Sequence, residues 1–310
     1  MRTYLISGPT GVIGKALVDR VVHTEPDAHF ILLTRNKENT ENSFKSLKNK
    51  EIIDWNDLTN YSFEPIDYVV HTAAPTASEY FVNKPVETID SIVNCSKLLL
   101  TKAVGTNLKS FIFLSSMEVY GDLESEEKIS EDSQGYLSLT STRSSYPLAK
   151  RLSELLCYSF FKEYGVPVKI VRPTLVIPKT YASTDNRVIP FALKAILAEK
   201  DIVLNTSGES KRDYVSIDDL ISAILLILEK GELGQTYNVS NEKTYCSINE
   251  MLKILIDTKK SEIKIQHELN EKSKFYPTRQ CICLNNSRLK NLGWSARDNL
   301  KDIFQQITLS

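Results

Sequence analysis

Three closely spaced glycines near the start of the chain restrict the fold more than any other feature of the sequence. The segment GPTGVIG places Gly8, Gly11 and Gly14 directly after the apolar run TYLIS and directly before a stretch with helical periodicity. In a tight strand-to-helix turn, backbone N–H groups and the helix dipole face outward, and a larger side chain would block an approaching pyrophosphate. This position favours a dinucleotide site over a glycine-rich turn without a ligand. The expected contacts come from Gly8, Thr10, Gly11, Val12, Ile13 and Gly14.

The first half of the chain alternates strand-like and helix-like segments. Apolar runs rich in β-branched and aromatic residues lie at 3–8, 29–34, 68–74, 110–116 and 168–173. Helical periodicity occupies the intervening segments 14–24, 85–104 and 146–165. Buried parallel strands have continuous apolar sequences, and strands that alternate with helices build a right-handed parallel sheet covered on both faces. The pattern predicts an α/β, Rossmann-type doubly wound fold.

The second half of the chain is organised differently. Helical segments lie at 190–199 and 215–231, and Ser216 and Asp219 have the spacing of a capping box at the start of the second. Residues 236–240, TYNVS, have the composition of one more strand of the main sheet. Beyond them the periodicity is weak.

These patterns predict two domains. The dinucleotide-binding domain is expected to span residues 1–174, with a returning segment at about 213–240. Residues 175–212 and 241–310 are expected to form a smaller C-terminal α/β domain that binds the substrate.

The charge balance argues against a nucleic-acid partner. The chain of 310 residues has 38 Lys and Arg against 39 Asp and Glu, so any anion site must be local. The acidic segment 121–132 is expected to be a solvated loop. The chain opens on a strand rather than on a charged-then-apolar leader, and no apolar run approaches the roughly 18 residues of a membrane span. We therefore expect a soluble cytoplasmic protein with no membrane partner.

The cysteines and histidines predict no metal centre. The five cysteines are odd in number and have no CxxC spacing, which favours reduced thiols. The four histidines form no ligand pattern either.

The end of the second strand bears on the choice of cofactor. An acidic residue there would accept hydrogen bonds from the adenosine ribose and favour NAD(H). The sequence LLTRNK has Arg35 and Lys37 instead, and a guanidinium binds a 2′-phosphate through two parallel hydrogen bonds. We therefore favour NADP(H). A merely solvated Arg35 would leave NAD(H) possible.

Further cofactor contacts are expected beyond the first two strands. Asp57 and Leu58, in the loop before the third predicted strand, can reach the adenine edge. Ala73 and Ala74 end that strand with small side chains, so that the backbone can pass beneath the cofactor. Pro173 is expected to contact the cofactor at the end of its own strand.

A tyrosine and a lysine lie four residues apart in the predicted helix at 146–165. Tyr146 and Lys150 therefore share one helix face, and Ser115 and Ser116 end the preceding strand at the rim where such folds bind ligands. A phenol with a pKa near 10 is a poor base, and a nearby ammonium would lower that pKa. Lys150 is also a candidate to hold the nicotinamide ribose. The three side chains together predict an acid–base site rather than an ordinary helix surface.

Four motifs together resemble a known family. GxxGxxG, SSMEVYG, YxxxK and RDYVSIDDL occur in the order and rough spacing of the extended short-chain dehydrogenase/reductases. These include the NAD(P)-dependent epimerase/dehydratase group, which acts on nucleotide-activated sugars. The resemblance covers essentially the whole chain. It implies a catalytic triad of Ser116, Tyr146 and Lys150, and homodimers formed through the helices at 85–104 and 146–164.

The resemblance also implies substrate contacts. Arg212, in an expected turn between the domains, matches a pyrophosphate-binding arginine, although a surface arginine is the alternative. A second such arginine would fall near Phe275, so its role would pass to a nearby cation. The candidates are Lys272, Lys274 and Arg279. Arg143 is a further candidate for a substrate contact.

The residues after the catalytic serine bear on the reaction. Where 4,6-dehydratases of the family carry an Asp–Glu pair, this chain has Met117 and Glu118. A thioether cannot protonate a leaving hydroxyl, so 4,6-elimination is disfavoured and Met117 is expected to line the sugar pocket. Glu118 remains a candidate base.

A preference for NADP(H) favours net reduction, because an epimerase regenerates its bound NAD whereas a reductase consumes NADPH. The segments APTASEYFVNKPVETI and TYCSINEML also resemble a subgroup found with sugar cytidylyltransferases in surface-polysaccharide loci, some of which reduce CDP-linked keto-sugars. The leading hypothesis is an NADPH-dependent reductase of a nucleotide-activated keto-sugar, with Tyr146 protonating an alkoxide that Ser116 polarises. A nucleotide-sugar epimerase, then a dehydratase, and a non-catalytic redox sensor remain alternatives.

Overall fold

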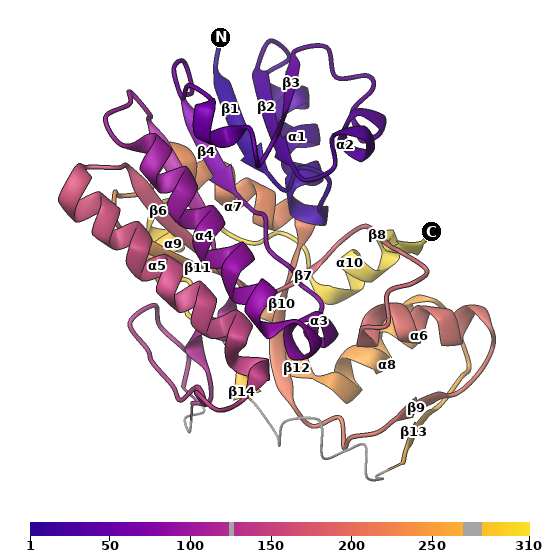
Figure 1. Ribbon diagram of the computed structural model, residues 1–310. Helices are drawn as coiled ribbons and strands as arrows, with labels where there is room; N and C mark the ends of the chain where they lie inside the picture. Colours follow the sequence, from indigo (N-terminus) through magenta and orange to yellow (C-terminus); the bar gives the residue numbers. More distant parts are fainter. Residues whose placement is uncertain (124–126, 269–280) are drawn as a thin grey trace.

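A seven-stranded parallel sheet forms the centre of the larger part of the molecule (Figure 1). The computed structural model describes residues 1–123, 127–268 and 281–310. The strand order is β11-β6-β5-β4-β1-β2-β3, which confirms the doubly wound α/β fold. Its strands are β1 (Thr3–Ser7), β2 (His29–Thr34), β3 (Lys50–Asp54), β4 (Tyr68–His71), β5 (Ser110–Leu114), β6 (Val168–Pro173) and β11 (Thr236–Val239). Of these, only β3 lacks a counterpart among the predicted strands.

Helices cover both faces of this sheet. On one face, α1 (Val12–Thr24) and α7 (Ile217–Lys230) pack on Tyr4 and Ile6 of β1. On the other face, α4 (Pro85–Ala103) and α5 (Ser145–Tyr164) pack on Leu5, which lies between Tyr4 and Ile6 in the sequence. Successive strand residues point to opposite faces, so a strand buried on both sides must be apolar throughout. The short helices α2 (Lys37–Ser43) and α3 (Ser78–Asn83) follow β2 and β4.

A second group of elements packs against the first through the strands after Pro173. It contains β7 (Leu175–Ile177), β10 (Lys211–Ser216), β12 (Asn241–Ser247) and β14 (Cys281–Ile282), all joined to β10. Two small sheets pair β9 (Ile202–Leu204) with β13 (Ile265–His267) and β8 (Thr180–Tyr181) with β15 (Thr308–Leu309). The helices of this group are α6 (Val188–Leu197), α8 (Ile248–Thr258), α9 (Ser287–Asn291) and α10 (Leu300–Gln306). Segment 213–240 supplies strand β11 to the large sheet and helix α7 to one face of that sheet. Its first residues belong to β10.

Only one of the two hydrogen bonds of the predicted capping box at the start of α7 is formed. The Ser216 Oγ accepts the backbone N–H of Asp219 at 3.1 Å, as expected. The Asp219 carboxylate instead accepts the backbone N–H of Arg297 at 3.1 Å. This helix terminus therefore also ties the segment before α10 to the large sheet.

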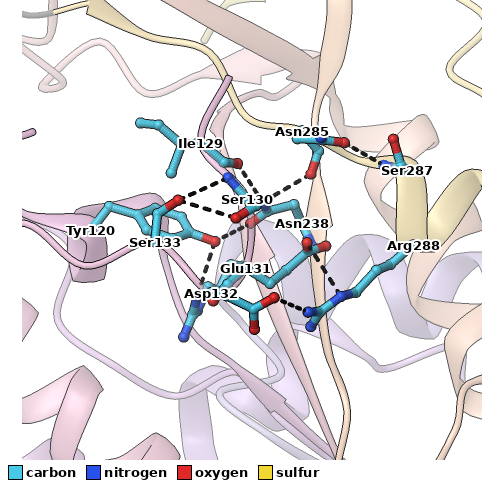
Figure 2. Close-up of polar contacts among 11 residues, drawn as sticks. Tyr120, Ile129, Ser130, Glu131, Asp132, Ser133, Asn238, Asn285, Ser287 and Arg288 are labelled. Atoms are coloured by element: carbon cyan, nitrogen blue, oxygen red, sulfur yellow. Dashed lines mark hydrogen bonds and ion pairs between the residues drawn. The ribbon is translucent and has the colours of Figure 1, made fainter. Parts of the chain in front are cut away.

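The expectation of a solvated acidic loop at 121–132 is wrong for Glu131. This side chain is buried, and its Oε1 accepts the backbone N–H of Asn238 in β11 at 2.9 Å. Figure 2 shows Glu131 and Asn238 within a polar cluster that also contains Arg288 and Asp132. Arg288 lies 3.6 Å from Glu131, so the carboxylate is partly compensated within the fold. A tertiary partner, rather than local composition, determines its burial.

Candidate active site

The turn between β1 and α1 has the close packing that a dinucleotide cradle requires. Gly8 has φ +69°, and a Cβ there would lie 2.9 Å from the Cα of Ala73. A Cβ at Gly14 would lie 2.3 Å from the Gly8 carbonyl oxygen, so no larger residue fits. Gly11 is the N-cap of α1 and makes no side-chain capping bond. The first N–H groups of the helix have no intrahelical acceptor, and they remain for a phosphate. Thr10, Val12 and Ile13 complete the turn, with Val12 half exposed.

A buried histidine ties together the strand ends beneath this turn. The His71 Nδ1 lies 2.6 Å from the Ser7 Oγ, and its Nε2 lies 3.1 Å from the Ser96 Oγ. Ser96 donates its own proton to the Ile92 carbonyl at 2.6 Å, so it accepts from the Nε2–H of the ring. Burial lowers the pKa of His71 to about 3, which keeps the ring neutral. A single histidine in an apolar strand gives no sequence signal for this role.

The residues predicted to select the cofactor lie at the ends of β2 and β3. Arg35 is exposed directly after β2, whereas Lys37 forms an ion pair with Asp57 at 2.9 Å. This pairing raises the pKa of Lys37 and lowers that of Asp57. Arg35 is therefore the better placed of the two predicted cations to meet a 2′-phosphate. Leu58 is fully buried, and its backbone N–H donates to the Trp55 carbonyl at 3.3 Å, so the residue presents no exposed surface for the predicted adenine contact.

Two hydroxyl groups meet at the carboxyl edge of the central strands. The Ser116 side chain, which follows β5, lies near the Tyr146 phenol of α5 and lowers its pKa. Burial raises the pKa of Tyr146, and the Glu118 carboxylate raises it further, while Ser116 and Arg143 act in the opposite direction. The phenol is therefore protonated in the described structure, ready to act as an acid.

Lys150 lies one helical turn beyond the tyrosine and is fully enclosed. Its ammonium donates to the Leu114 carbonyl at 2.7 Å and stands 5.9 Å from the centre of the Tyr146 ring. Burial lowers the pKa of Lys150 to about 8, against the raising effect of Glu154. The hydrogen bond holds the lysine under the end of β5, beside the two hydroxyls. Ala73, Ala74 and Pro173 lie at the same edge, after β4 and at the end of β6.

The residues after Ser116 divide between the core and a charged pair. Met117 is buried, and the Thr174 hydroxyl lies 3.6 Å from its sulfur. Glu118 forms an ion pair with Arg143 at 2.8 Å. Both members of this pair act electrostatically on the Tyr146 hydroxyl, so the structure brings Arg143 and Glu118 to the predicted site together.

The predicted substrate contacts in the smaller part of the chain have different outcomes. The expectation that Arg212 lies in a turn is wrong, because it belongs to β10, opposite Cys246 of β12 and Ile282 of β14. Strand pairing on both sides extends the ordered segment through this position. The candidates Lys272, Lys274 and Arg279 lie outside the described residues, as does Phe275.

Sequence reasoning missed one aromatic residue at the site. Phe81 of α3 is buried and stacks on the Tyr146 ring, with 4.4 Å between ring centroids. The segment SEYFVN has no motif that would identify it. Within the described residues, no group of three or more His, Cys, Asp or Glu side chains is arranged to hold a metal. The helices of that same part of the chain include none suited in length and hydropathy to cross a bilayer.

The glycine cradle and the Ser–Tyr–Lys site define an enzyme of the short-chain dehydrogenase/reductase type. The family model described as the NAD dependent epimerase/dehydratase family matches residues 4–240. The chain therefore belongs to the NAD-dependent epimerase/dehydratase family.

Comparison with individual proteins agrees with this placement. A trifunctional UDP-glucose 4,6-dehydratase/UDP-4-keto-6-deoxy-D-glucose 3,5-epimerase/UDP-4-keto-L-rhamnose-reductase of Arabidopsis thaliana is 27% identical over 97% of this chain and 46% of its own length. The UDP-glucose 4-epimerase of Thermotoga maritima, solved with UDP-glucose, has TM-score 0.83 at 21% identity, over 98% and 96% of the two chains. The UDP-glucuronic acid 4-epimerase of Bacillus cereus, solved with UDP-glucuronic acid and NAD, has TM-score 0.81 at 21% identity, over 98% and 97%. The first curated relatives are matched over only 46% to 61% of their own lengths.

Proposed function

We propose that this protein is an NADP(H)-dependent oxidoreductase that reduces a keto group on a nucleotide-activated sugar. The observation that carries the proposal is the approach of the Ser116 side chain to the Tyr146 phenol, at the strand edge that also holds the glycine cradle. A protonated phenol paired with a hydroxyl suits a carbonyl oxygen that gains negative charge.

The residues of the chain divide the chemical work among them. A bound nicotinamide dinucleotide would supply the hydride. Ser116 would donate a hydrogen bond to the sugar oxygen and hold it against Tyr146, which would give up its phenolic proton. The Lys150 ammonium, 5.9 Å from the tyrosine ring, would stabilise the resulting phenolate. We also propose Lys150 as the contact for the nicotinamide ribose.

The choice of NADP(H) rests on Arg35. This side chain is exposed after β2, where an acidic residue would favour NAD(H). Lys37 and Asp57 form an ion pair with each other. Arg35 therefore has neither Lys37 as a rival for a 2′-phosphate nor an unpaired Asp57 carboxylate to repel that phosphate. NAD(H) remains the alternative, since the Bacillus cereus neighbour was solved with NAD.

An epimerase is the second candidate function, favoured by the family and by the Thermotoga maritima neighbour. Both reactions use the same hydroxyl pair and differ in whether the cofactor is consumed. A 4,6-dehydratase is less favoured, because Met117 packs in the core against Thr174 and offers no proton.

The substrate, assembly and location of the protein are parts of the same proposal. Arg212 would contact the diphosphate of a nucleotide sugar, with CDP-linked sugars of surface-polysaccharide synthesis as the first candidates. A homodimer would form through α4 and α5, which expose Val86, Ile89, Leu152 and Leu155. The five free thiols fit a reducing, cytoplasmic environment.

A direct absorbance assay tests this function. The purified protein is incubated with NADPH or NADH and a panel of CDP-, UDP- and dTDP-linked 4-keto-sugars, while absorbance reports the oxidation of the cofactor. We expect stoichiometric NADPH oxidation with at least one keto-sugar. Sugar interconversion without net oxidation of the cofactor would contradict the reductase and favour the epimerase. No conversion of any sugar would favour the redox sensor.

A further inference from the structure

A second aromatic ring covers one face of the Tyr146 phenol. The Phe81 and Tyr146 rings lie 4.4 Å apart at an interplanar angle of 9°, and Phe81 is only 1% exposed. The Arg143 guanidinium lies 5.2 Å from the centroid of the Phe81 ring. Near-parallel rings at this separation exclude water and resist rotation of either partner. The tyrosine ring is thus held from the side by its stacking contact.

The helix that carries Phe81 is anchored to both parts of the site. Figure 1 shows α3 beside the N-terminal ends of α4 and α5. The Ser145 hydroxyl, next to the catalytic tyrosine, donates to the Phe81 carbonyl at 3.2 Å. Ala74, from the loop that links β4 to α3, packs against the cluster of Phe81 and Tyr146. The short helix therefore connects the proposed cofactor seat with the acid.

We propose that Phe81 is a positioning residue that fixes the Tyr146 ring in the orientation at which its hydroxyl meets Ser116. The proposal rests on the proposed acid role of Tyr146 for its effect on rate. Rotation about the tyrosine side chain would carry the hydroxyl away from Ser116, because the two groups come from different elements, α5 and the turn after β5. Stacking against Phe81 opposes that rotation without touching the reacting atoms.

Three charged groups also surround the phenol, and they belong to separate elements. Glu118 lies in the 3-10 helix η2 (Met117–Tyr120), Arg143 lies in η3 (Thr142–Ser144), and Lys150 lies in α5. Loss of the Phe81 ring would open one face of the phenol to water and would also remove the ring over which Arg143 lies. Since burial is the largest cause of the raised pKa of Tyr146, that pKa should fall towards its ordinary value.

The test compares Phe81→Leu with a matched aromatic pair elsewhere. Phe30 is also 1% exposed and stacks on a tyrosine, Tyr4, at 5.9 Å, in the strands far from the site. Full-length wild type, F81L, F81Y and F30L are labelled with [13Cζ]tyrosine, and the Tyr146 resonance is assigned with Y146F. We expect F81L to shift that resonance, because it removes the ring that stacks on Tyr146, and to lower its titration midpoint. F81Y, which keeps a flat ring, should stay close to wild type, and F30L should leave Tyr146 unchanged.

Rate measurements give a second, separate outcome. With an active sugar, F81L should lower kcat at least tenfold while cofactor affinity and thermal unfolding stay within the range of F30L. An unchanged Tyr146 resonance and titration in F81L, or an equal change in F30L, would overturn the positioning role. If Y146F keeps full activity, the proposed function fails, and the NMR titration still decides the role of Phe81.

Discussion

The Ser116 side chain lies near the Tyr146 phenol and lowers its pKa, although the two residues lie 30 positions apart in different elements. The N-terminal end of α5 and the end of β5 therefore meet at this point. Lys150 donates to the Leu114 carbonyl two residues before Ser116, so a hydrogen bond ties these two elements together. The predicted catalytic groups thus form one arrangement.

Removing the phenolic hydroxyl should abolish the reaction and leave cofactor binding intact. Tyr146→Phe deletes only the proton donor, so turnover should fall by about 10² to 10⁴-fold. NADPH affinity, measured by fluorescence titration, should change less than threefold. Retention of wild-type turnover would remove Tyr146 as the acid.

The guanidinium of Arg35 should discriminate between the two dinucleotides. Arg35→Ala should weaken NADPH by roughly 10- to 100-fold, the magnitude of lost charge-assisted hydrogen bonds, and should hardly affect NADH. Lys37→Ala is the matched control, because Lys37 is already paired with Asp57. Calorimetric titration with both cofactors measures the difference. Equal losses for NADPH and NADH would contradict an NADP(H) site.

The pH dependence of catalysis should reflect Lys150. Its pKa is lowered to about 8 by burial, so the side chain is charged below that pH and neutral above it. If the ammonium stabilises the phenolate, kcat/KM, which reports the free enzyme, should fall as the pH rises through about 8. Lys150→Arg keeps its charge throughout this range, so its residual activity should lack that descending limb. If wild type and Lys150→Arg show the same fall in kcat/KM with rising pH, that fall belongs to the titration of another group.

A buried ion pair behind the catalytic helix should matter for stability. Arg172 donates to both oxygens of Glu154, at 2.9 and 2.6 Å, and both side chains are largely buried. Arg172→Ala would leave a buried carboxylate without its partner, so it should lower the unfolding free energy by about 3–5 kcal/mol. The exposed pair of Arg2 and Glu25 provides the comparison, and Arg2→Ala should cost at most about 1 kcal/mol. Urea denaturation of both variants distinguishes the two cases.

The exposed apolar side chains of α4 and α5 test the proposed homodimer. Leu155 of α5 is 59% exposed, and Leu155→Glu would bury a charge in the proposed interface. Light scattering after size-exclusion chromatography should then report a monomer. Leu197 of α6 is 73% exposed and lies outside that surface, so Leu197→Glu should remain a dimer. A wild-type monomer at micromolar concentration would contradict the proposed assembly.

The sequence predicts this fold well wherever one local signal is enough. The glycine turn, the continuous apolar strands and the long periodic helices each follow from local rules, and their order leads to the doubly wound sheet. Strand β3, KEIID, is missed because it is mostly polar and gains its ordering from pairing with β2. Arg212 is similarly placed in a strand by its neighbours rather than by its local sequence.

The parts of the site that sequence could not predict are those made by tertiary contact. Glu131 lies in an acidic stretch, yet the backbone of β11 draws it into the interior. The pairing of Glu118 with Arg143 depends on the path of the loop between them. Phe81 lies in a short helix without a motif, and only the folded chain brings its ring onto Tyr146.

Isotope transfer tests the central claim most directly. The enzyme is incubated with NADPH deuterated at both C4 positions of the nicotinamide and with a nucleotide-linked keto-sugar, and the mass of the sugar product is measured by mass spectrometry. Our account predicts one deuterium in the product for each molecule of labelled cofactor oxidised, with no transfer by Tyr146→Phe. Conversion of the sugar with unlabelled product and no cofactor oxidised would contradict it.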